Sequence, residues 1–133
     1  MVRMFLTGGG MSGGPLHGHL HGAPLVGKLR TAPRYRFYTV RGEFPGLVPV
    51  GAGGVGIEGE LYELPDEVLR DSLLPAEPEE LELGMIELED GSAAFAMLVA
   101  RWCRDRDDVL DISEFGGWRA FLEQRSPGRA GTA

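Results

Sequence analysis

Met4-Phe5-Leu6-Thr7-Gly8-Gly9-Gly10-Met11-Ser12-Gly13-Gly14 is the stretch on which the fold prediction depends, because an apolar run changes abruptly into a glycine-rich segment. Five of the last seven residues are glycine, more than a simple turn requires. Without Cβ atoms, several backbone N–H groups can converge on one point, which is how proteins hold a carboxylate, a phosphate or an oxyanion. We therefore predict a core strand over residues 2–7 and, after it, the floor of a small-anion pocket. A glycine-rich surface loop is the alternative.

The length of 133 residues suits a single core. We expect one domain over residues 1–125 and a flexible C-terminal tail over 126–133, which is rich in small residues. The net charge of −7 argues against a nucleic-acid partner, because phosphate binding needs clustered Lys and Arg. No apolar run approaches the roughly 20 residues of a membrane-spanning helix, so we expect no membrane partner. A single cysteine, Cys103, excludes an internal disulfide and favours the cytoplasm.

Charge is unevenly distributed along the chain. Residues 1–50 contain six basic side chains and one acidic side chain, Glu43. The glycine-rich segment therefore lies in the electropositive half of the sequence, which favours a small anionic ligand.

Periodicity and turn residues predict an α+β fold: a small mixed or antiparallel β-barrel with flanking short helices. Gly51-Ala52-Gly53-Gly54 and Glu89-Asp90-Gly91-Ser92 are predicted hairpin connections, and a change of parity near Gly84 predicts a β-bulge. A helix is expected to begin at Pro65 and to end at Pro75-Ala76-Glu77-Pro78. The expected strands cover about 24–32, 35–41, 47–50, 55–64, 81–88 and 93–102, with a helical turn at 15–20 and a final helix near 116–124.

Carboxylates supply the candidate acid/base groups. Glu58, Glu60 and Tyr62 alternate along the strand predicted over 55–64 and share one of its faces. If that face looks into a barrel mouth, burial would raise the pKa of a glutamate there, and Tyr62 would donate to a ligand oxygen. Solvated carboxylates on an outer face are the alternative. Glu77 begins an acidic run in the loop after the first long helix, and a solubilising surface run is its alternative.

Histidines occur only at the alternating positions 17, 19 and 21. Zinc sites usually have wider spacings and add a cysteine or carboxylate, so we expect no metal here. His17 is retained as a candidate for lining the pocket.

The order of several short motifs resembles the gamma-glutamylcyclotransferase-like superfamily, and it looks closest to the branch that contains the C-terminal domain of allophanate hydrolase. A strand and a glycine loop lead to Gly14-Pro15-Leu16-His17, and Gly59-Glu60-Leu61-Tyr62-Glu63-Leu64-Pro65 precedes a short helix. Arg30-Thr31-Ala32-Pro33-Arg34-Tyr35-Arg36 and Leu83-Gly84-Met85-Ile86-Glu87-Leu88-Glu89-Asp90-Gly91 are similar to segments of that branch. The likeness covers about residues 2–102.

The resemblance implies a barrel whose glycine loop grips substrate through backbone amides, with a glutamate after the helix that moves protons. In cyclotransferases the glycine loop begins Tyr-Gly-Ser/Thr-Leu, and the corresponding residues of this chain are Thr7-Gly8-Gly9-Gly10. The catalytic pattern Leu-Asp-x-x-Glu-Gly corresponds to residues 73–78, which keep the glutamate, Glu77, and lack the aspartate and glycine. We therefore expect Glu77 as the acid/base; the expected ligand contacts are Thr7, Gly8, Gly9, Gly10, His17, Glu60 and Tyr62.

Three functions remain open at this point. The first is a protein that binds a small carboxylate or amide metabolite and cyclises gamma-glutamyl amines. The second, implied by the closer branch, acts on a carboxylated urea-type product beside an amidase partner. The third is a ligand-binding or assembly module without catalysis. None requires an organic cofactor, and the macromolecular partners expected are an amidase or a second copy of the chain.

Overall fold

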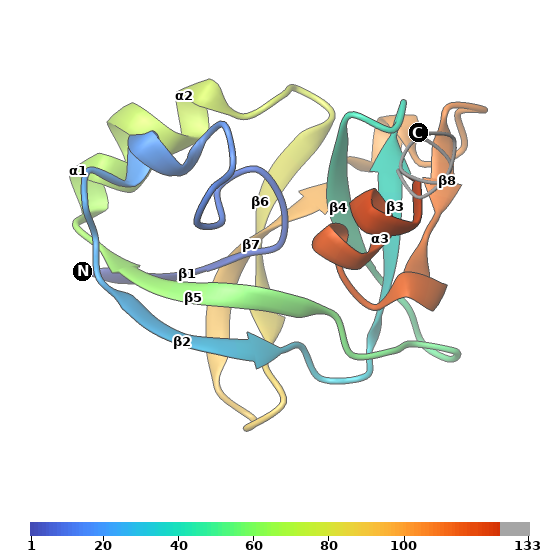
Figure 1. Ribbon diagram of the computed structural model, residues 1–133. Helices are drawn as coiled ribbons and strands as arrows, with labels where there is room; N and C mark the ends of the chain where they lie inside the picture. Colours follow the sequence, from blue (N-terminus) through green and yellow to red (C-terminus); the bar gives the residue numbers. More distant parts are fainter. Residues whose placement is uncertain (126–133) are drawn as a thin grey trace.

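The computed structural model describes residues 1–125 (Figure 1). The tail predicted over residues 126–133 lies outside this part of the chain. The sheet is mixed, curls into a half-barrel and carries a few short helices, so the predicted α+β class is confirmed. Within residues 1–125, no helix is long and apolar enough to cross a membrane.

The eight strands form one sheet in the order β2-β5-β1-β7-β4-β3-β8, with β6 paired to β7 off this path. Strand β7 is the junction of the sheet, because it runs parallel to both β1 and β4 and antiparallel to β6. The bounds are β1(Val2–Leu6), β2(Leu25–Arg30), β3(Tyr35–Val40), β4(Phe44–Pro49), β5(Glu58–Leu64), β6(Leu81–Glu87), β7(Ala93–Val99) and β8(Val109–Asp111).

Strand β1 carries the glycine segment into the centre of the molecule. Met4, Phe5 and Leu6 are all buried, which means that both faces of this strand are covered. Its antiparallel partner β5 is likewise buried on both faces from Gly59 to Tyr62. A strand with two covered faces shows an apolar run in place of alternation, which is the pattern at the start of the sequence.

One helical segment links β5 to β6 and consists of α1(Asp66–Val68), the π-helical turn η2(Leu69–Leu73) and α2(Leu74–Ala76). It begins after Pro65, as predicted, with two acidic residues in its first turn, where the helix dipole favours them. Leu69 and Leu73 anchor it in the core. The backbone becomes extended at Glu77, so this side chain emerges where the helix ends.

The structure corrects two local predictions. Residues 51–54 form no hairpin, because β4 pairs with β3 and β7 whereas β5 pairs with β1 and β2. No bulge occurs near Gly84, since β6 and β7 pair in unbroken register. A Cβ atom at Gly84 would lie 2.5 Å from Leu98, so close packing accounts for this glycine. The register shift in the sheet falls instead between Leu25 and Gly27.

Three short elements had no counterpart in the prediction: β8 and the 3-10 turns η3(Arg101–Cys103) and η4(Ser113–Phe115). The last helix, predicted near residues 116–124, is α3(Trp118–Arg125). The predicted turn near residues 15–20 is the 3-10 helix η1(His17–Leu20). Cys103, at the end of η3, is buried.

Candidate functional site

A cavity of about 390 Å³ lies where the glycine segment meets three other parts of the chain. These are the β3–β4 turn with the start of β4, the residues that follow α2, and α3. In Figure 1 the dark blue loop after β1 lies between the α1–α2 helical segment and the red helix α3. The volume suits a small metabolite. Its lining includes Leu6, Thr7, Gly8, Gly9, Gly10, Glu43, Phe44, Glu77, Met97, Trp118 and Leu122.

The glycine residues that line this cavity have N–H groups without a protein acceptor among the described residues. The carbonyl oxygens of Gly8 and Gly9 accept from the N–H groups of Met11 at 3.0 Å and Leu16 at 2.8 Å. The Gly10 carbonyl oxygen accepts from Nδ1 of His17 at 2.9 Å, which places the proton of this imidazole on Nδ1. The N–H groups of Gly8, Gly9 and Gly10 donate to no acceptor within residues 1–125. Three satisfied carbonyls and three available amides leave a surface that favours negative charge.

Glu60 holds the far end of the same segment. Its side chain is 2% exposed and accepts from the N–H of Ser12 at 2.7 Å and from the hydroxyl of Tyr62 at 2.8 Å. Arg119 of α3 adds two contacts at 3.2 Å. Burial alone would raise the pKa of Glu60, but these donors together lower it below its usual value. Burial and the neighbouring Glu60 carboxylate raise the pKa of Tyr62 to about 12, so this phenol stays protonated.

Glu77 faces the cavity from the residues that follow α2. Its carboxyl group is half-buried and makes no hydrogen bond with the part of the chain that the structure describes. Burial raises its pKa to about 7. The group therefore exists in both protonation states near neutral pH, which suits it to proton transfer.

The structure brings together five of the eight residues predicted for the site: Thr7, Gly8, Gly9, Gly10 and Glu77 all line the cavity. His17, Glu60 and Tyr62 do not line it. They contact the glycine segment or one another, and the rings of His17 and Tyr62 lie 5.7 Å apart. Glu58, on the same strand as Glu60, pairs with Arg30 at 2.7 Å near the surface.

The apolar wall of the cavity was missed by the sequence reasoning. Trp118 and Leu122 of α3 line it together with Phe44, the first residue of β4. The only signal in the sequence is the helical spacing of Trp118, Phe121 and Leu122, which predicts a buried helix face and not a ligand. Across the described residues 1–125, no group of three or more His, Cys, Asp and Glu side chains is placed to hold a metal ion.

The raised pKa of Glu77 predicts a pH dependence of stability. The folded state binds a proton more tightly than the unfolded state, whose carboxyl titrates near its ordinary value of about 4.3. The contribution of this group to the free energy of unfolding therefore declines as pH rises from about 4.5 through 7. Urea unfolding of the wild type and of Glu77→Gln at pH 5 and pH 8 measures this contribution to the free energy of unfolding. We expect the wild type to lose more stability over this interval than the variant; equal losses would contradict the assignment.

The curled mixed half-barrel with short flanking helices is the gamma-glutamylcyclotransferase-like fold. An aig2-like protein from Mus musculus shares this fold with a TM-score of 0.59, over 75% of this chain and 78% of that chain, at 22% identity. The family model of the allophanate hydrolase C-terminal domain matches residues 2–123. The chain belongs to this family, and the match extends past the predicted limit at residue 102 to include most of α3.

Three further proteins are more similar to this chain than the aig2-like protein is. The urea amidolyase of Saccharomyces cerevisiae is 26% identical over 92% of this chain. The allophanate hydrolase of Kluyveromyces lactis has a TM-score of 0.85 and 27% identity over 92% of this chain. The chain spans only 7% of the length of the first and 21% of the second. A protein specific to uropathogenic E. coli has a TM-score of 0.84 and 29% identity, over 92% of this chain and 95% of that chain.

Proposed function

We propose that the cavity binds a small carboxylated nitrogen compound and that Glu77 supplies the proton for its breakdown. The observation that carries this proposal is the pairing of three available N–H groups, at Gly8, Gly9 and Gly10, with a raised-pKa carboxyl group in one cavity. The amides favour a ligand carboxylate, and the neutral form of Glu77 can donate a proton beside it.

The relatives indicate which compound to test. Hydrolysis of the amide of allophanate leaves an amine that carries two carboxylates. In the proposed step, the N–H groups hold one carboxylate while Glu77 donates its proton to the nitrogen. The bond between nitrogen and the other carboxylate carbon breaks, that group leaves as CO2, and carbamate remains. Glu77 then takes a proton from water, so the step balances and needs no cofactor.

Cyclisation of gamma-glutamyl amines is the second candidate, and the same carboxyl group supports it. In its ionised form Glu77 would take a proton from the attacking amine and return it to the departing one, releasing 5-oxoproline. The two candidates require opposite protonation states of Glu77, so their rates should change with pH in opposite directions.

An amidase is the proposed partner, because both the urea amidolyase and the allophanate hydrolase relatives are much longer proteins that contain this domain. A homodimer is the alternative assembly. We propose a cytoplasmic location, which is consistent with the free, buried thiol of Cys103.

A coupled assay tests the proposal directly. Allophanate is supplied with an amidase that hydrolyses it, with and without this protein, and the initial rate of CO2 release is compared with that of ammonia. We expect the protein to speed CO2 release and to leave unchanged the initial rate of ammonia release, which the amidase sets. Release of 5-oxoproline from a gamma-glutamyl amine would favour cyclisation instead. A ligand-dependent rise in Tm without turnover of either substrate would identify a binding module.

A further inference from the structure

Arg41 lies at the turn between β3 and β4 with an unusual backbone conformation. Its φ angle is +55°, in the left-handed region that side-chain-bearing residues rarely adopt, and the next residue is Gly42 at +71°. Asn, Asp or Gly normally occupies such a position. A strained residue persists where surrounding contacts require its side chain, so the guanidinium is the feature to explain.

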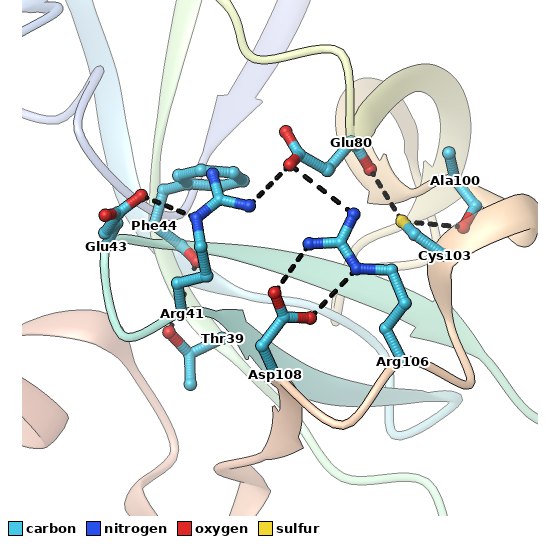
Figure 2. A network of polar contacts seen from close by, with 9 residues as sticks. All are labelled: Thr39, Arg41, Glu43, Phe44, Glu80, Ala100, Cys103, Arg106 and Asp108. Atoms are coloured by element: carbon cyan, nitrogen blue, oxygen red, sulfur yellow. Dashed lines mark hydrogen bonds and ion pairs between the residues drawn. The ribbon is translucent and has the colours of Figure 1, made fainter.

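The guanidinium joins two carboxylates from different parts of the chain, Glu43 of the β3–β4 turn and Glu80 of the segment that follows Glu77 (Figure 2). Its Nε donates to Glu43 at 2.9 Å, and its Nη1 donates to Glu80 at 2.6 Å. Glu43 lines the cavity from the turn. Glu80 is only three residues beyond Glu77 and is 7% exposed.

The backbone and the side chain of Glu80 are both held by contacts with other parts of the chain. Its backbone carbonyl oxygen accepts from the N–H of Ala100 at 2.8 Å, which secures it to the end of β7. Arg106 approaches the same carboxylate at 3.7 Å while pairing with Asp108 (Figure 2). Hydrogen bonding from Arg41 lowers the pKa of Glu80, so the carboxylate stays charged and the pair persists at neutral pH.

We propose that Arg41 is a positioning residue that, by pairing with both Glu43 and Glu80, holds two walls of the cavity at a fixed separation. One wall is the turn, and the other carries Glu77. The separation between these two walls selects ligands by their length. This inference rests on the proposed function, because it assumes that the ligand is a small carboxylated compound. Lysine cannot replace arginine here, because a point charge lacks the planar fork that reaches two carboxylates at once.

The test compares two dicarboxylates of different length, malonate and glutarate, by isothermal titration calorimetry. We expect the wild type to bind one of the two dicarboxylates more tightly than the other. Arg41→Gln should reduce the ratio of the two Kd values by about tenfold, because a displacement of the cavity walls on the ångström scale is enough to lose this discrimination. Arg41→Lys should behave like Arg41→Gln. Arg36→Gln is the matched control, since Arg36 is on β3, the strand that leads into Arg41, pairs with Asp111 at 3.0 Å and does not line the cavity.

Hydrogen exchange provides a readout that needs no ligand. The N–H of Glu77, which donates to Leu74 at 3.1 Å, should exchange about tenfold faster in Arg41→Gln, while the Arg36→Gln rate stays at the wild-type value. If the wild type binds neither dicarboxylate, the proposed function fails and this exchange rate alone decides the inference. A variant that lowers Tm but keeps both the Kd ratio and the Glu77 exchange rate would overturn the positioning role.

Discussion

Glu77→Gln should lower the rate of CO2 release by about 10²- to 10⁴-fold, the range that general acid catalysis contributes. The amide keeps the size of the side chain and removes its transferable proton. The cavity walls and the available N–H groups of the glycine segment are unchanged, so the rise in Tm on adding a carboxylate ligand should remain. Initial rates in the coupled assay, together with thermal unfolding with and without ligand, measure both quantities.

Glu79→Gln is the control for this experiment. Glu79 has the same chemistry two residues away, is exposed and does not line the cavity, so its rate should equal that of the wild type. The wild-type rate should also fall as pH rises above about 7, because the donating form of Glu77 is lost. Full turnover by Glu77→Gln would remove this residue from the mechanism. A rate that rises with pH would favour the base required for cyclisation.

Gly14→Ala should weaken carboxylate binding by about 10- to 10²-fold, because a hydrogen bond to a charged group contributes about 1.5–3 kcal/mol. A Cβ atom at position 14 would lie 2.2 Å from the carbonyl oxygen of Gly9 and 2.7 Å from its carbonyl carbon. Both atoms belong to the backbone, so the segment has to move as a whole and its N–H groups lose their arrangement. Calorimetric titration with malonate measures the change in Kd.

Gly18→Ala is the matched control, because a Cβ atom there meets nothing within 4 Å. This variant should bind malonate as the wild type does. Thermal unfolding of both variants verifies that each is folded. Equal Kd values for Gly14→Ala and Gly18→Ala would show that the shape of the glycine segment does not determine binding.

The parts of the fold that sequence predicts are those with a local signature. An apolar run before clustered glycines predicted β1 and the segment after it, and Pro65 with two acids predicted the start of the helix that ends at Glu77. The pairing of β1 and β4 with β7 could not be predicted from local sequence. Pairing of Met4 with Phe95 and of Leu47 with Leu98 joins distant parts of the chain, and neither pair leaves a periodic trace in sequence.

The candidate site was predictable in its backbone and less so in its side chains. Alternation along β5 placed Glu60 and Tyr62 on one face, but it could not tell which environment that face meets. The donors that surround Glu60 come from Ser12 and from Arg119, far away in the sequence. The same holds for the acidic run after α2. Glu77 and Glu80 are both glutamates of the same acidic run, so the sequence does not distinguish them. In the structure, Glu77 lines the cavity and Glu80 accepts a hydrogen bond from Arg41 of the β3–β4 turn.

Strand β7 determines when the molecule can assemble during synthesis. Since β1, β4 and β6 all pair with it, the ribosome must have released the chain beyond Val99 before these three strands can complete their hydrogen bonding. Such a dependence on contacts between distant residues slows folding relative to proteins built from local contacts. Until then the apolar first strand leaves an edge unpaired on the nascent polypeptide, and such an edge is prone to aggregation.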